Sequence, residues 1–179
     1  MTAINAPLAP HGYSASMDAV ADPFAALTEE HAELTRLFSY HQEALLDRDW
    51  VTAAGLLGSY RERLYRHMEI EERFVLDPAR VPAAAHPRWT TELYRAEHRR
   101  VRLYLERVDE WLTRARHDGA PAGMLIGLLD RERTLKHLLE HHHHREEVVL
   151  FAHLRRSLPA RLHAALGRAL AEPASAAAP

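Results

Sequence analysis

Two motifs of the form HxxxE, each within a long segment of helical periodicity, most constrain how this chain can fold. The first runs from His67 to Glu71 and the second from His142 to Glu146. Residues four positions apart lie on one face of an α-helix, so each motif presents an imidazole and a carboxylate side by side. Such a pair is a bidentate metal-ligand arrangement, and it predicts helices whose motifs face a shared partner.

Four long amphipathic segments predict an all-α fold. Asp22, followed by a proline, can cap the first helix, and Asp49 can cap the second. Short connections between long helices favour an antiparallel up-down-up-down four-helix bundle. An amphipathic segment after Pro159 predicts a short extra C-terminal helix. The four long helices are expected at about residues 23–47, 50–76, 88–117 and 121–154.

The composition along the chain divides it into one domain and two tails. A bundle domain is expected over residues 22–172, long enough to bury a sizeable core. Residues 1–21 are rich in Ala, Pro and Ser without periodicity, which predicts a flexible N-terminal segment. The same composition predicts a disordered tail at residues 173–179.

An antiparallel bundle places four histidines at one level. At 1.5 Å per residue, each lies roughly 12–20 Å from the same end of the bundle. Each also falls on the apolar stripe of its own helix, so its side chain is expected to point inward. With the two carboxylates of the HxxxE motifs, the candidate layer consists of His31, His67, Glu71, His98, His142 and Glu146.

Six such groups in one buried layer favour a metal site over a structural polar core. Their burial is costly unless they are satisfied by one another or by cations. The chain has 14 histidines and no cysteine, so its ligands must be imidazole and carboxylate. This mixture suits iron or manganese, and six ligands exceed what one zinc ion takes. Carboxylates can bridge two ions about 3.5–4 Å apart, which predicts a dinuclear site.

Together with Glu30-His31 and Glu97-His98, the two HxxxEE stretches resemble the hemerythrin-like HHE cation-binding domain. The resemblance covers about residues 23–155. It implies a non-haem centre of two iron ions with an oxo or hydroxo bridge. It also implies terminal ligands His31, His67, His98 and His142, and bridging ligands Glu71 and Glu146.

The chain departs from the oxygen-carrying hemerythrins in one informative position. Those proteins show HxxxH on the third helix, whereas the residue four after His98 is Arg102. In the fourth helix the second ligand is a glutamate at i+4, where the carriers have an aspartate at i+5. With fewer protein ligands, a coordination position is open to water or substrate, which favours redox chemistry over simple oxygen carriage.

The expected function is that of a hemerythrin-like non-haem di-iron protein that binds or senses oxygen or nitric oxide. Two alternatives stay open: an oxidoreductase that acts on peroxide or activates oxygen, and a protein that stores or donates iron. The sequence does not decide whether the chain is an enzyme. The expected partners are a small diatomic ligand or peroxide, and an electron donor that the sequence does not identify.

The run of four histidines leaves the ligand of the fourth helix open. Neighbouring residues on a helix lie about 100° apart, so at most one or two of these side chains can face the core. His142 is predicted because it shares a face with Glu146 and the apolar stripe, and His141 and His143 are the alternatives.

Further polar groups are expected away from the ligands themselves. Glu30, Glu72, Glu97 and Glu147 are predicted to lie on the surface or to orient the ligands. His41 and Glu132 should meet about 15 Å from the metal layer. They form either a buried hydrogen-bonded pair or part of a proton or ligand path with Tyr60 or Tyr104.

Charge and hydropathy exclude other classes of partner. The formal net charge is −2 and the isoelectric point is about 6.7, which gives no electrostatic case for nucleic acid. The sequence contains no run of about 18 apolar residues, the length that a membrane-spanning helix needs. The N-terminus lacks the pattern of a signal peptide. A cytoplasmic location is therefore the expectation.

Overall fold

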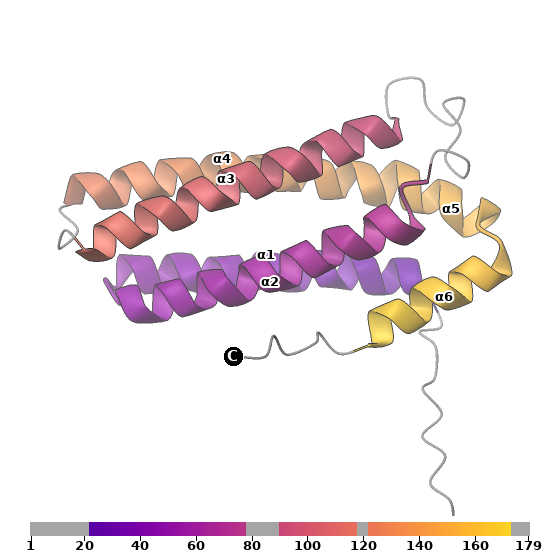
Figure 1. Ribbon diagram of the computed structural model, residues 1–179, viewed down its shortest axis with the longest axis horizontal. Helices are drawn as coiled ribbons and strands as arrows, with labels where there is room; N and C mark the ends of the chain where they lie inside the picture. Colours follow the sequence, from indigo (N-terminus) through magenta and orange to yellow (C-terminus); the bar gives the residue numbers. More distant parts are fainter. Residues whose placement is uncertain (1–21, 78–89, 118–121, 173–179) are drawn as a thin grey trace, which may run out of the picture.

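The computed structural model describes residues 22–77, 90–117 and 122–172, and within these ranges it contains helices and no strands. Four long helices form the bundle, and α4 continues through a π-helical segment, η2, into α5 (Figure 1). The elements are α1 (Pro23–Leu46), α2 (Trp50–Phe74), α3 (Thr91–His117), α4 (Ala122–Arg145), η2 (Glu146–Phe151), α5 (Ala152–Ser157) and α6 (Ala160–Ala171).

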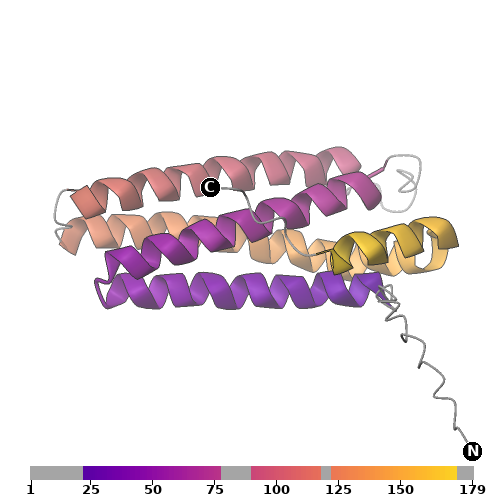
Figure 2. The same ribbon diagram turned by 60° about the horizontal axis from the view of Figure 1, so that its bottom comes forward.

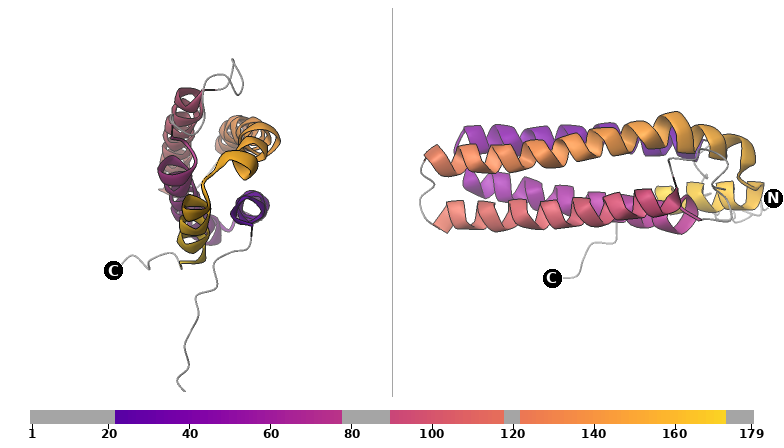
Figure 3. Two further views of the ribbon diagram at one scale, coloured as in Figure 1. Left: turned by 90° about the vertical axis from the view of Figure 1, so that its right-hand side faces the viewer. Right: turned by 90° about the horizontal axis from the view of Figure 1, so that it is seen from above.

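The predicted all-α class and the antiparallel bundle are confirmed. Helices α1 and α2 pack as one pair and α3 and α4 as the other (Figures 1 and 3). Helix α6 turns back and packs against α1 and α2 at the end of the bundle where α1 begins (Figure 2). The predicted tails at 1–21 and 173–179, and the predicted start of the third helix near Arg88, lie outside the described residues.

The first two helices begin directly after Asp22 and Asp49, the residues that were predicted to cap them. The carboxylate of Asp22 accepts hydrogen bonds from the amides of Phe24 and Ala25, at 3.0 and 3.2 Å. Asp49 accepts from the amide of Thr52 at 3.0 Å. Each cap satisfies amides of the first helical turn that have no partner within the helix.

The apolar stripes of the helices form two hydrophobic clusters with a polar layer between them. One cluster fills the part of the bundle toward the α1–α2 connection, and the other fills the end covered by α6. The layer of predicted ligands is thus shielded from bulk water along the bundle axis in both directions. The first cluster includes Leu34, Phe38, Leu64, Leu105 and Leu135, and the second includes Phe24, Leu27, Leu150, Phe151 and Leu166.

The fourth helix differs from the continuous α-helix that its periodicity predicts. From Glu146 to Phe151 it has the wider π-helical turn, which begins at the second carboxylate of the HxxxE motifs. Such segments are rare and frequently occur at functional sites. In this turn the successive residues Leu150 and Phe151 are both buried, at 1% and 0% exposure. Hydrophobic periodicity carries no signal for a π turn, so sequence reasoning missed it.

His41 and Glu132 meet as predicted. His41 Nε2 lies 2.9 Å from Glu132 Oε1, and its Nδ1 lies 2.8 Å from the carbonyl oxygen of Ala53. Both side chains are fully buried, and Glu132 also accepts a hydrogen bond from Gln42 at 2.9 Å. The carbonyl is an acceptor only, so Nδ1 donates to it. The contact joins α1 and α4 within the first hydrophobic cluster.

Replacing one member of this pair is expected to be destabilising. Glu132→Ala leaves Nε2 of His41 buried without its hydrogen-bond partner, and an unsatisfied buried polar group of this kind costs about 1–3 kcal/mol. The measurement is the free energy of unfolding by urea denaturation. The control is Glu110→Ala, since Glu110 forms an ion pair with Arg114 on the surface, where little change is expected. Equal free energies for both variants would contradict a structural role for the pair.

Candidate metal centre

Four helices bring the six predicted ligand residues into one buried layer. His31 comes from α1, His98 from α3, and the two HxxxE motifs from α2 and from the α4–η2 junction. The side chains belong to long helices packed on both sides of the layer, so their positions are held by the core. Exposure is 3% for His31, 2% for His67, 0% for Glu71, 0% for His98, 1% for His142 and 0% for Glu146.

The four imidazoles form two pairs. The Nε2 atoms of His31 and His67 lie 3.0 Å apart, and those of His98 and His142 are also 3.0 Å apart. With a metal–nitrogen distance of about 2.1 Å, two ligands at right angles on one ion are separated by about 3 Å. Each pair therefore has the separation of adjacent ligands on a single ion.

The two carboxylates lie between the histidine pairs. Glu71 directs Oε1 to His67, at 3.3 Å, and Oε2 to His98, at 3.4 Å. Glu146 directs Oε2 to His31, at 3.5 Å, and Oε1 to His142, at 3.1 Å. Each carboxylate thus presents one oxygen to each pair, which is the arrangement of a bridging ligand.

The donor atoms of this layer fit two metal ions. The four carboxylate oxygens of Glu71 and Glu146 are buried without a hydrogen-bond partner in the described part of the chain. Buried polar atoms without partners are costly, and cations would satisfy them. Two four-residue groups have ligand atoms within 4.8 Å of one another and share both glutamates: His31, His67, Glu71, Glu146 and Glu71, His98, His142, Glu146.

Three outer carboxylates hold the imidazoles in position. Each accepts a hydrogen bond from the Nδ1 atom of a histidine, which leaves Nε2 directed at the centre of the layer. The fourth predicted carboxylate, Glu30, instead forms an ion pair with Arg63 at 2.6 Å. Glu72, Glu97 and Glu147 thus lie where groups that orient the histidines were predicted, whereas Glu30 is partly buried and contacts Arg63 instead. The three bonds join His31 to Glu147 at 2.8 Å, His98 to Glu72 at 2.9 Å and His142 to Glu97 at 2.9 Å.

The pKa values of the side chains in the layer shift in different directions. Burial and the charge of His67 lower the pKa of His31 to about 3, which keeps this imidazole neutral. Burial alone would lower the pKa of His142, but Glu146 and Glu97 outweigh it and raise the pKa to about 10. Burial and the charge of Glu71 raise the pKa of Glu146. Metal ligands must be deprotonated, so a metal that binds here displaces protons from the layer.

The histidine run separates into inward and outward residues. His142 lies in the layer as predicted, whereas His141 is exposed and contacts the ring of His137 at 4.7 Å. His144 is exposed as well. His143, predicted only as an alternative to His142, also turns inward, and its Nε2 atom is buried.

Arg102 occupies the position where a further ligand of the third helix was considered, and it points elsewhere. Its guanidinium lies over the ring of Tyr65, 4.7 Å from the centroid, and 3.8 Å from the carboxylate of Glu72. Glu72 in turn accepts from His98. Arg102 is thus connected to the layer through Glu72, the outer carboxylate on the neighbouring helix α2.

A cavity of about 410 Å³ adjoins the layer on the side of α1 and α4. His31 and His143 line it on the side of the layer, and Tyr60 and Leu139 are also among its lining residues. Thr35 is exposed and also lines the cavity, so the cavity reaches the surface. Tyr60, one of the two tyrosines considered for a path, is therefore on the same cavity as His31.

The fold and this layer define a helical bundle with a buried cation site of histidines and carboxylates. The sequence model of the hemerythrin HHE cation-binding domain matches residues 22–120, more than half of the chain. The chain belongs to this family. No significant match was found among curated proteins or among solved structures.

The matched range ends before the second HxxxE motif. It contains α1, α2 and α3, with His31, His67, Glu71 and His98, and it stops ahead of α4. The family match therefore does not cover His142 and Glu146, and their contacts with His98 and His31 are seen in the structure alone. None of the helices in the described ranges is long and apolar enough to cross a membrane.

Proposed function

We propose that this chain holds two iron ions in the layer and binds a small ligand there, oxygen or nitric oxide. One observation carries the proposal: two groups of four ligand residues share the same two carboxylates. A site for one ion has no need of a second pair of histidines at the far oxygens of Glu71 and Glu146. In this proposal His31 and His67 hold one ion, and His98 and His142 hold the other.

The donor set favours iron or manganese over copper and zinc. Imidazole and carboxylate together suit iron or manganese, and the two four-residue groups contain none of the thiolate or thioether ligands that favour copper(I). Zinc in structural sites takes four ligands in a closed tetrahedron, whereas these groups share two of their members. Bound iron would supply a redox-active centre with a position for an external ligand. The protein supplies the orientation of the imidazoles and the exclusion of water.

The cavity supports a small ligand that approaches from the side of α1 and α4. It reaches from the surface to His31, so a diatomic molecule has a route to the His31 and His67 pair. The hydrophobic clusters on both sides of the layer disfavour entry along the bundle axis. A low dielectric around the centre also strengthens every electrostatic interaction within it.

Two measurements on the iron-loaded chain test the proposal. Metal analysis should give close to two irons per chain. Anaerobic titration of the reduced protein with nitric oxide should change the optical spectrum until a fixed ratio of ligand to chain is reached. One iron per fully loaded chain would reject the dinuclear centre. Sustained consumption of hydrogen peroxide over many cycles, lost in Glu71→Ala, would replace binding with the enzymatic alternative.

A further inference from the structure

His143 is the one inward residue of the layer that the proposed pair of four-ligand groups leaves unused. Its Nε2 atom is buried and has no hydrogen-bond partner among the described residues. A buried polar atom without a partner is destabilising unless another group satisfies it. Since the atom belongs to an imidazole in the wall of the metal layer, it points to a bound ion.

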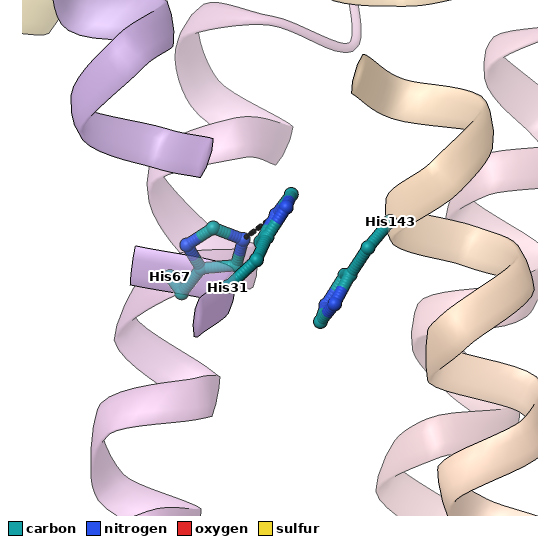
Figure 4. A group of neighbouring side chains, drawn as sticks. All are labelled: His31, His67 and His143. Carbon is teal, nitrogen blue, oxygen red and sulfur yellow. Dashed lines mark hydrogen bonds between the residues drawn. The ribbon is translucent and has the colours of Figure 1, made fainter. Parts of the chain in front are cut away.

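The ring of His143 lies against the His31 and His67 pair. It stacks on the ring of His31 with centroids 3.8 Å apart and planes at 3°, and Figure 4 shows the two rings facing each other from different helices. The ligand nitrogens of these three histidines lie within 4.8 Å of one another. Ligands on opposite sides of one ion lie about 4.2 Å apart for a metal–nitrogen distance of about 2.1 Å. Because the planes of the His31 and His143 rings are parallel, one of these two rings has to turn for all three imidazoles to bind a single ion.

The helical geometry of α4 explains how two adjacent residues serve two different ions. Consecutive side chains point about 100° apart around the helix axis. Helix α4 contacts both α3 and α1. His142 faces His98 of α3, with 3.0 Å between the Nε2 atoms, and His143 faces His31 of α1.

We propose that His143 binds the metal ion of the His31 and His67 pair, which gives this ion three imidazoles and the other ion two. The inference rests on the proposed function, because it assumes a dinuclear centre. The chain would then draw its fifth imidazole from α4, while the position on α3 is occupied by Arg102.

The position of His143 on the cavity has a consequence for the ligand site. His143 and His31 both line the cavity of about 410 Å³. If His143 binds the ion of the His31 and His67 pair, its imidazole occupies a coordination position on the cavity side and leaves fewer positions there for an external ligand. The ion of the His98 and His142 pair has no residue in the cavity lining. The two ions would therefore differ in ligand number and in access.

The test compares His143→Ala with the wild type and with a control variant, each as the full chain loaded with ⁵⁷Fe. His144→Ala is the matched control, since His144 is the next residue, is exposed and lines the same cavity. Mössbauer spectra are recorded on the oxidised proteins without added ligand. In His143→Ala one quadrupole doublet should change and the other should remain, whereas His144→Ala should match the wild type. Iron affinity should fall by more than the roughly 10–100-fold caused by loss of an outer hydrogen-bond partner.

Rescue by free imidazole distinguishes a His143 that binds the metal from a His143 that only packs beside the site. The cavity can admit imidazole, so millimolar imidazole should restore the altered doublet in His143→Ala. If circular dichroism shows that His143→Ala does not fold, His143→Gln, which keeps much of the volume and polarity of the side chain, takes its place and should change the same doublet.

Three outcomes would overturn the role of His143. Unchanged doublets in the variant mean that His143 is not a ligand. A spectral difference that appears only after nitric oxide is added means that His143 contacts the bound ligand instead of the iron. Fewer than two irons in the wild type would reject the dinuclear centre itself. This result can be told apart from a failure of the His143 proposal, because it is measured on the wild type without any variant.

Discussion

Removing iron from the loaded protein is expected to lower its melting temperature by about 10 °C or more. An ion present at 1,000 times its dissociation constant adds about 4 kcal/mol to stability. In a chain of this size each kcal/mol shifts the melting temperature by roughly 2–4 °C. The layer joins all four long helices, so the ions bind only the folded state in this geometry. Without them Glu71 and Glu146 are left side by side in a buried layer.

Calorimetry of the chelator-stripped and the anaerobically iron-reconstituted chain measures this difference. The exposed histidines His137 and His141 can also take up metal, and His141→Ala controls for their contribution. The shift should be retained in His141→Ala, because its side chain is outside the layer. Equal melting temperatures for the stripped and loaded wild type would mean that the layer is satisfied by its own protons and hydrogen bonds.

Glu71→Ala is expected to reduce the iron content from close to two per chain to below one. The substitution removes one oxygen from each of the two ligand groups, since Oε1 faces His67 and Oε2 faces His98. Loss of an outer hydrogen-bond partner already lowers metal affinity by roughly 10–100-fold. A residue that contacts both ions should have a larger effect than this at both. Metal analysis after desalting, together with iron titration of the stripped protein, measures the loss.

The matched control is Glu69→Ala, which removes a carboxylate two residues away on the same helix. Glu69 is exposed, so this variant should keep close to two irons. A third variant, Glu72→Gln, removes the charge of the outer carboxylate that accepts from His98, and it should fall between the other two. If Glu71→Ala binds iron as tightly as the control, Glu71 does not bridge the ions and the dinuclear proposal fails.

Local sequence signals were sufficient to predict where the first two helices begin and which faces of the long helices are buried. Asp22 and Asp49 begin α1 and α2 because their side chains satisfy amides that no helix can satisfy internally. The three-to-four spacing of apolar residues marks the faces that became the two hydrophobic clusters. These signals act within a few residues and need no knowledge of the partner helix.

The level of the site along the bundle was also predictable from the sequence. A rise of about 1.5 Å per residue and antiparallel connections determine which residues share a layer. The same reasoning placed His41 opposite Glu132, and the structure has their side chains 2.9 Å apart. Levels depend on helix length alone, so small errors in the helix ends do not change them much.

Around the helix axis, the sequence determined which stripe faces inward, but the tertiary structure decided which partner each inward side chain meets. His142 and His143 both turn inward, and only the contacts of α4 with α3 and α1 send one to His98 and the other to His31. The π turn at Glu146 has no sequence signal either. Periodicity describes one helix in isolation, whereas the direction of a side chain within the layer depends on how neighbouring helices pack against it. The sequence by itself thus determined the donor types, their spacing and their level, and helix packing decided how they divide between two subsites.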